Sequence, residues 1–142
     1  MDNNVESRNQ TQEMAMQIMY GFLIQQETNQ VINVEETISE VSGKPYEECD
    51  LFLKELLIES LKNEKEIIDY ISTFLNKWKF ERLNYCIQAI LIIAVSNYFY
   101  CNNKEKAVVI NVAVKLAKKY GEDKDYKFVN AILDNALNDR KQ

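Results

Sequence analysis

Lysine side chains recur at helical spacing near the C-terminal end of the sequence. Lys115, Lys118 and Lys119 are spaced so that a helix would carry them in one cationic row. The apolar row of the same segment consists of Val109, Ala113, Leu116, Ala117 and Tyr120. Gly121 follows directly, and we expect it to end the helix in the left-handed conformation that glycine tolerates.

A second polar group follows within a few residues. Asp125 is a candidate N-cap for a further helix, which would place Lys127 and Asn130 near its first turn. The apolar row of that helix consists of Phe128, Val129, Ile132, Leu133 and Ala136. Backbone N–H groups at a helix N-terminus attract anions, so the sequence predicts a phosphate-binding surface beside the lysine row. The alternative is an ordinary solvated helix face with cations near its C-terminus.

The composition argues against most catalytic chemistry. The sequence contains no histidine, which is the commonest general base and transition-metal ligand. Cys49, Cys86 and Cys101 never stand in a CxxC spacing, so we expect reduced structural thiols in the cytosol rather than disulfides or a zinc site. The acidic residues form no convincing catalytic pair and accompany no glycine-rich phosphate loop. We therefore expect a protein that is not an enzyme and uses no cofactor or metal.

Charge is distributed unevenly along the sequence. The net charge is −5, which argues against a general nucleic-acid binder. From Lys104 onward, however, nine basic and six acidic residues give +3, so the preceding part carries −8. An acidic body with a basic end can still meet phosphate on one face.

The elements that position these side chains are expected to be helices. With only three glycines and one proline, 142 residues offer little turn chemistry for a β fold, and we expect one all-α domain over 1–142. The expected helices span 6–26, 34–41, 46–61 after Pro45, 64–75 and 83–100, followed by the two C-terminal helices. The apolar run 86–101 is shorter than the roughly 20 residues of a membrane span, so it predicts a buried central helix. The start of the sequence has no signal-peptide pattern.

Four blocks of sequence resemble the NusB family of transcription antitermination factors. The most specific block pairs INVAVKLAKKYG at 110–121 with KFVNAILD at 127–134, because amphipathicity alone does not require this combination of residues. The weaker blocks are AMQIMY at 15–20, WKFERL at 78–83 and AILIIA at 89–94. The resemblance covers nearly all of the chain. It implies that the expected helices, about seven in number, form two helical subdomains packed crosswise.

The resemblance also implies a function and its partners. Members of the family bind boxA-like single-stranded RNA of the ribosomal RNA leader together with ribosomal protein NusE, within the RNA polymerase antitermination complex, and promote ribosomal RNA transcription. The implied RNA-binding residues are Arg8, Gln12, Gln17, Tyr20, Lys115, Lys118, Lys119, Lys127, Phe128 and Asn130. The implied partner-binding residues are Ile87, Gln88, Leu91 and Ile92. We expect a cytoplasmic protein without a membrane partner, and a homodimer remains an open alternative.

The sequence departs from the family at several positions. The arginine-rich opening of the family is represented by Arg8 alone, so we expect weaker RNA binding than in a typical relative. Ile92 and Val112 replace charged residues, which leaves internal packing and an outer apolar patch as alternatives. We interpret Trp78 as an anchor between subdomains rather than a ligand contact.

Two alternative functions are open, a helical protein-binding adaptor that has lost most RNA affinity and an accessory domain of ribosomal RNA cytosine methyltransferases. The second is disfavoured because no catalytic domain accompanies it.

Overall fold

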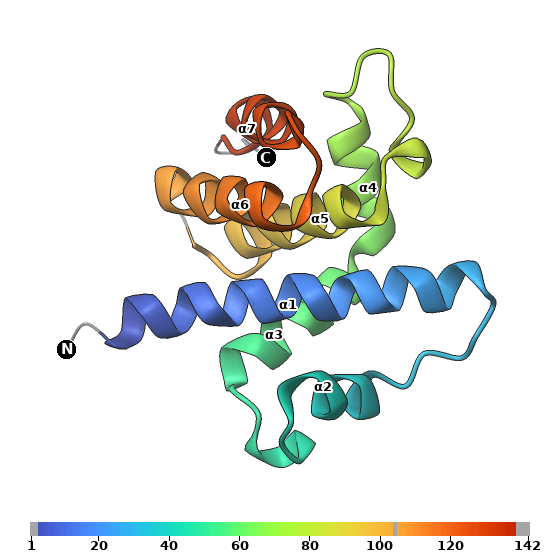
Figure 1. Cartoon of the computed structure of the whole chain (residues 1–142), viewed down its shortest axis with the longest axis vertical. Helices are drawn as coiled ribbons and strands as arrows, with labels where there is room; N and C mark the ends of the chain where they lie inside the picture. The colour runs from blue at the N-terminus through green and yellow to red at the C-terminus, as the bar shows by residue number, and fades with distance from the viewer. Residues whose placement is uncertain (1–2, 104, 139–142) are drawn as a thin grey trace.

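The computed structural model describes residues 3–103 and 105–138, with side chains from residue 8 onward. Within these residues the chain forms seven α-helices, two short 3₁₀ helices and no strand, which confirms the all-helical prediction (Figure 1). The α-helices are α1 (Asn3–Glu27), α2 (Val34–Ser42), α3 (Leu51–Lys62), α4 (Glu64–Ser72), α5 (Tyr85–Tyr100), α6 (Lys106–Tyr120) and α7 (Asp125–Ala136). The 3₁₀ helices are η1 (Tyr46–Glu48) and η2 (Phe80–Arg82).

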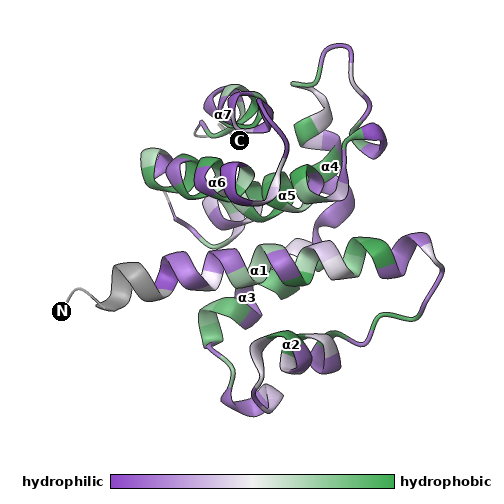
Figure 2. Cartoon of the chain, viewed as in Figure 1, coloured by the Kyte–Doolittle hydropathy of each residue, from purple (hydrophilic) through white to green (hydrophobic). Residues whose placement is uncertain are grey.

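Helix α5 forms the centre of the core. All side chains from Ile87 to Tyr98 are buried, and α1, α3, α4, α6 and α7 pack around this helix. Figure 2 shows that α5 is hydrophobic along most of its length. A helix that is apolar on all sides must be covered on all sides, which explains its central position. No helix in the described part of the chain combines the length and the apolar character that crossing a bilayer requires.

The long helix α1 lies between two groups of helices. In Figure 1, α2 and α3 lie on one side of α1, and α6 and α7 lie on the other. Helix α1 contacts α2 and α3 as well as α5 and α6. Its fully buried side chains include Ile18, Met19 and Phe22. One face of α1 therefore borders the lysine-bearing helix α6.

Local signals explain where two helices begin. Helix α3 begins at Leu51 rather than at the predicted Tyr46, because the Asp50 side chain caps it by accepting the N–H of Leu53 at 3.0 Å. Pro45 instead precedes the separate turn η1. Asn84 caps α5 in the same way, through the N–H of Ile87 at 2.9 Å. A polar residue just before a helix was the better boundary signal.

The turn between α6 and α7 differs from the prediction. Gly121 ends α6, but with φ −92° and ψ −174° its backbone is extended and not left-handed. Glycine is needed here for close approach, because a Cβ would stand 2.6 Å from the carbonyl oxygen of Ala117. Asp125 is not the N-cap of α7 either. Lys124 occupies that position with φ 75°, and the Asp125 carboxylate accepts the N–H of Glu122 at 2.7 Å.

The loop between α4 and η2 contradicts the anchor interpretation of Trp78. The Trp78 side chain is 60% exposed, so it does not lie between packed elements. Leu75 and Phe80 are the buried residues of this segment. These two side chains attach the loop to the core and leave Trp78 outside.

Candidate nucleic-acid interface

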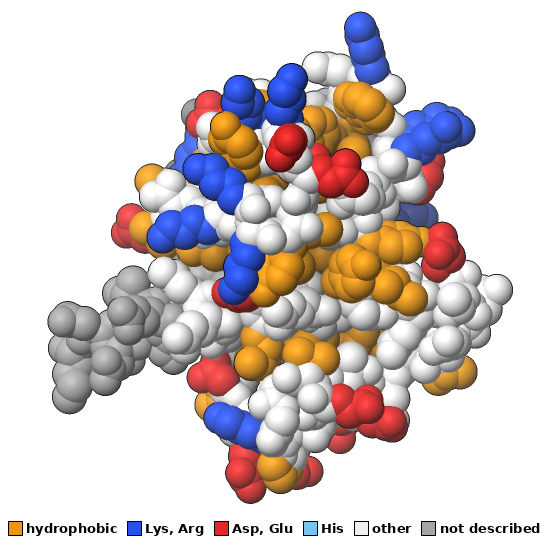
Figure 3. Space-filling view, in the orientation of Figure 1, with side chains coloured by type: hydrophobic (Ala, Val, Ile, Leu, Met, Phe, Trp, Pro, Cys, Tyr) orange, Lys and Arg blue, Asp and Glu red, His pale blue; other side chains and the backbone are white. Residues whose placement is uncertain are grey.

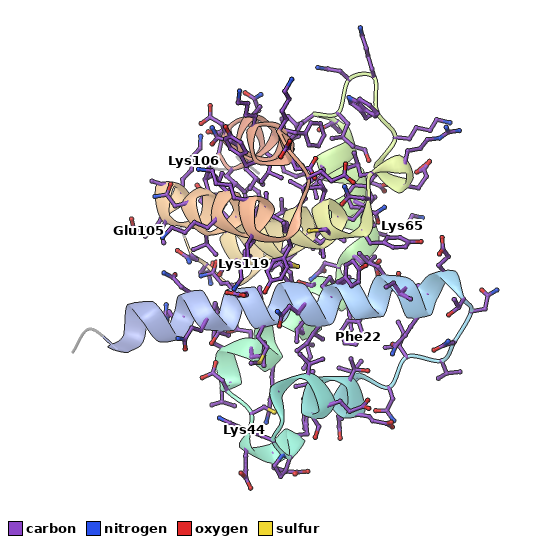
Figure 4. The ribbon with its side chains drawn as sticks, in the orientation of Figure 1. Phe22, Lys44, Lys65, Glu105, Lys106 and Lys119 are labelled. Carbon is purple, nitrogen blue, oxygen red and sulfur yellow. The ribbon has the colours of Figure 1, made fainter. Side chains whose placement is uncertain are left out.

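A polar network joins α1 to the last turn of α6. The Glu13 carboxylate accepts hydrogen bonds from Nζ of Lys119 at 2.7 Å and from the hydroxyl of Tyr120 at 2.5 Å. Nε2 of Gln17 donates to the same Tyr120 hydroxyl at 2.9 Å. Figure 4 shows Lys119 between the two helices. Two predicted RNA-binding residues, Gln17 and Lys119, therefore lie together on one exposed surface.

This network sets the charge state of its two ionic partners. The hydrogen bond from Lys119, followed by that from Tyr120, lowers the pKa of Glu13 below its usual value. The same carboxylate raises the pKa of Lys119. The ion pair remains open to solvent, with 59% of the Lys119 side chain exposed. Lys119 is thus a stable cation, but Glu13 neutralises part of its field.

A groove of about 470 Å³ adjoins the network, between α1 and the N-terminal end of α5. The rings of Tyr20 and Tyr85 meet edge to face in it, with centroids 6.5 Å apart. The Tyr20 ring is 41% exposed and so is accessible for stacking. The carboxylates that line the groove are Glu27, Glu81 and Glu122. The hydrogen bond to Glu27 raises the pKa of Tyr85. This acidic lining disfavours a phosphate group here.

The lysine row of α6 also reaches α7. Nζ of Lys118 lies over the ring of Tyr126, 4.8 Å from its centroid. Lys127 and Asn130 are exposed on α7, and Phe128 between them is half-buried. Lys118 therefore contacts α7, on which Lys127 and Asn130 are exposed, whereas Phe128, two positions after Tyr126, projects from a different side of α7. Lysines and an accessible aromatic ring are a combination suited to single-stranded RNA.

The two remaining predicted cations lie differently. Lys115 is exposed one turn before Lys118 and extends the row along α6. Arg8 is also exposed, but its guanidinium lies over the ring of Phe52 in α3, 5.4 Å from the centroid. Figure 3 shows Lys and Arg side chains over α6 and α7 and acidic side chains over α2. The structure gathers the lysines and leaves Arg8 apart from them.

Five of the predicted contact residues are buried and cannot meet a ligand on this surface. Gln12 is only 4% exposed, because its position on α1 faces α5 and α6. The predicted partner-binding residues Ile87, Gln88, Leu91 and Ile92 are all buried in α5. Nε2 of Gln88 is used internally, donating to the carbonyl oxygen of Leu83 at 2.7 Å. Since Val112 is buried as well as Ile92, internal packing is the correct alternative for these two departures.

Three residues of the surface were missed by sequence analysis. Tyr120 was placed in the apolar row of α6, yet it is 40% exposed and carries hydrogen bonds. Glu13 and Tyr126 were not considered as contacts. Glu13 lies one helical turn before Gln17, Tyr126 directly precedes Lys127 and Tyr120 directly follows Lys119, so helical neighbourhood was the available signal.

The cysteines do not provide a nucleophile near this surface. Burial, and then the charge of Asp125, raises the pKa of the Cys86 thiol beside the tyrosine-lined groove. Burial, with Glu55 and Glu59, raises the pKa of Cys101 to about 12. Reactive cysteines have lowered pKa values, so these thiols are structural. Among the described residues no cluster of His, Cys, Asp or Glu is arranged to hold a metal ion.

Comparisons with known proteins agree with this architecture. The transcription antitermination protein NusB of Macrococcus caseolyticus is 34% identical over 134 residues, covering 94% of this chain and 98% of that protein. A chain in a crystal structure of antitermination factors NusB and NusE in complex with double-stranded RNA superimposes with a TM-score of 0.77 at 25% identity, covering 92% of this chain and 95% of that one. A chain in a crystal structure of a plectonemic RNA supercoil superimposes with a TM-score of 0.78 at 26% identity, covering 91% of this chain and 92% of that one. The NusB family model matches residues 9–138, and the chain therefore belongs to the NusB family.

Proposed function

We propose that this protein binds boxA-like single-stranded RNA together with ribosomal protein NusE, as a non-enzymatic adaptor in antitermination of ribosomal RNA transcription. The observation that carries the proposal is the gathering of Lys115, Lys118 and Lys127 on adjacent faces of α6 and α7, in a chain with a net charge of −5. Family membership supports it, as does the similarity to a structure that contains NusB, NusE and RNA.

In the proposed mechanism, cationic side chains contact the phosphates, and other side chains contact the bases. The lysines of α6 and α7 hold phosphates, which sets affinity without reading sequence. Asn130 and the rings of Tyr20 and Phe128 contact unpaired bases, which expose their edges and faces in single strands. NusE supplies a further part of the surface and links the RNA to the RNA polymerase complex. Because the four residues predicted for NusE binding are buried, NusE uses other residues.

A titration of a boxA-like RNA tests the proposal. We expect fluorescence anisotropy to show binding that appears or becomes tighter when NusE is added. The variant K118E/K127E should weaken RNA binding by on the order of tenfold per reversed charge, because each lysine then repels a phosphate. Its helix content, measured by circular dichroism, should be unchanged because both residues are exposed.

The matched control reverses two exposed lysines elsewhere. Lys44 lies between α2 and η1, and Lys65 lies on α4, away from α6 and α7 (Figure 4). The variant K44E/K65E has the same net charge as K118E/K127E, so an equal loss of affinity would show that only total charge matters. If the wild-type protein binds NusE but binds no RNA, either with or without NusE, it is instead an adaptor that has lost its RNA affinity. The Glu13–Lys119 pair and the single Arg8 are the features that favour this second candidate.

A further inference from the structure

A second groove, of about 510 Å³, lies between the α4–η2 loop and the turn that joins α6 to α7. Its lining includes Trp78, Arg82, Leu83, Lys124, Glu122 and Phe128. The volume falls within the range of sites that hold small organic ligands. None of these residues except Phe128 has been assigned to the proposed interface.

The backbone at Trp78 is fixed at the edge of this groove. Leu75 and Phe80, which are 2% and 4% exposed, attach the loop to the core on both sides of it. The backbone N–H of Trp78 donates to the carbonyl oxygen of Leu75 at 2.8 Å, which fixes the turn. Trp78 as a whole nevertheless remains 60% exposed. An exposed aromatic ring on a fixed stretch of backbone is a stacking platform that requires little backbone ordering when a ligand binds.

The charges around the groove select the kind of ligand. Exposed Lys77 and Lys79 flank Trp78 in the chain, and Arg82 and Lys124 line the groove itself. Figure 3 shows hydrophobic side chains at the upper right, where Figure 1 places this loop, with Lys and Arg side chains above and beside them and acidic side chains nearby. Aromatic rings among cations are the pattern of single-stranded nucleic-acid sites.

Two acidic residues also line the groove, but they leave its cationic side open. The carboxylate of Asp125 accepts the backbone N–H of Glu122 at 2.7 Å and is occupied within the α6–α7 turn. Glu122 is exposed and lines both this groove and the tyrosine-lined groove, so it lies where the two grooves meet. That neighbouring groove carries three carboxylates, so phosphates are favoured on the Arg82 and Lys124 side instead.

We propose that the groove between Trp78 and Phe128 binds an unpaired base of the RNA strand, which stacks on Trp78 while Arg82 and Lys124 contact the adjacent phosphates. This inference rests on the proposed function. It adjoins that interface at α7, where the exposed Lys127 directly precedes Phe128 of the groove. An RNA strand that leaves the lysines of α6 and α7 therefore continues into this groove.

Trp78 is the only tryptophan of the chain, so its fluorescence reports on this groove alone. RNA is titrated with and without NusE while two signals are recorded, the anisotropy of labelled RNA and the tryptophan emission with unlabelled RNA. The W78A complex supplies the background emission when NusE is present. We expect quenching of Trp78 emission that saturates with the anisotropy signal. W78A should weaken single-strand affinity roughly 5- to 100-fold, the effect of removing one stacking ring.

Two variants separate stacking from general damage. W78F retains a ring and should keep most of the affinity. L51A removes another highly exposed apolar side chain, from α3, and should leave RNA affinity unchanged. The W78A effect should also shrink with a double-stranded RNA, whose bases are already stacked.

The outcomes that overturn the inference are distinct from failure of the proposed function. RNA that binds by anisotropy, without a change in Trp78 emission and with equal affinity for W78A, overturns the inference and leaves the proposed function standing. A W78A variant that loses NusE affinity but keeps RNA affinity assigns the groove to the protein partner and also overturns it. Absence of RNA binding by both signals, with and without NusE, contradicts the proposed function and the inference together.

Discussion

Glu13 already forms an ion pair with Lys119, one of the cations that an RNA phosphate would contact. Its carboxylate lies 2.7 Å from Nζ of Lys119 and holds the Tyr120 hydroxyl as well. We predict that E13Q raises RNA affinity roughly 2- to 10-fold and steepens the salt dependence by about 0.7 units, because one more lysine becomes available to phosphate. E40Q is the matched control, because it removes one exposed carboxylate on α2, away from Lys119. Equal gains from both variants would mean that net charge, and not the release of Lys119, is responsible.

The same ion pair should make stability depend on acid pH. Hydrogen bonds from Lys119 and Tyr120 lower the pKa of Glu13 in the folded protein below its ordinary value of 4.5. The contribution of ionised Glu13 to the free energy of unfolding is therefore fully present above pH 4.5, and it is lost as the pH falls through the lowered pKa of the folded protein. The wild-type protein should be slightly more stable than E13Q near neutral pH, and this difference should vanish in acid. Thermal unfolding of both proteins between pH 7 and pH 3 measures it, and a difference that grows in acid would contradict the assignment.

Individual contacts were the least predictable part of the site. Gln12 and Gln17 lie on the same helix, yet Gln12 is buried and Gln17 is exposed, since only one of them faces α5 and α6. Tyr120 fits the apolar period of α6, but the helix extends past the core at that point and leaves the ring 40% exposed. Periodicity identifies a face of a helix, and it does not show where along the helix the neighbouring elements end.

At the scale of elements, the apolar helix α5 shows both what the sequence predicts and where family resemblance misleads. Its composition predicted a buried central helix, and the structure confirms this. Ile87 and Ile92 were nevertheless among the residues assigned to a partner surface on the strength of the resemblance. A helix that is apolar on every side has no free face, so the physical signal should have outweighed the positional one.

The α6–α7 turn depends on Gly121 for space. A Cβ at this position would lie 2.6 Å from the carbonyl oxygen of Ala117 and 2.8 Å from a carboxylate oxygen of Asp125. We predict that G121A lowers the free energy of unfolding by about 1–3 kcal/mol, because backbone must move to relieve the overlap. It should also weaken RNA binding, since the turn positions Lys118 against α7.

Gly21 provides the control for this substitution. It lies inside α1, where an added Cβ meets nothing within 4 Å. G21A should therefore raise the free energy of unfolding by roughly 0.5–1 kcal/mol, the usual gain of alanine over glycine within a helix. Urea denaturation compares the two variants. Equal changes in both would contradict the steric role of Gly121.

At the scale of the molecule, composition predicted the fold class, helical periodicity predicted the number of helices, and the resemblance predicted two crosswise subdomains. The scarcity of glycine and proline pointed to helices, and the helix positions were close to those observed. The packing of α2 and α3 on one side of α1, and of α6 and α7 on the other, does not follow from periodicity. It depends on which side chains interdigitate at each crossing, and a single helix does not encode that.

The distribution of charge over the molecule sets how RNA binding should depend on salt. Of the predicted phosphate contacts, Arg8, Lys115, Lys118 and Lys127 are exposed and Lys119 is paired with Glu13. Arg8 lies apart from the others over Phe52, so the three unpaired lysines give a slope of log K against log salt of about −2 for a single strand, and Arg82 and Lys124 would extend it to about −3.5. Anisotropy titrations of the protein without NusE, at several salt concentrations, measure this slope. A slope steeper than about −6 would require more phosphate contacts than this surface offers, and it would place the RNA on a different face.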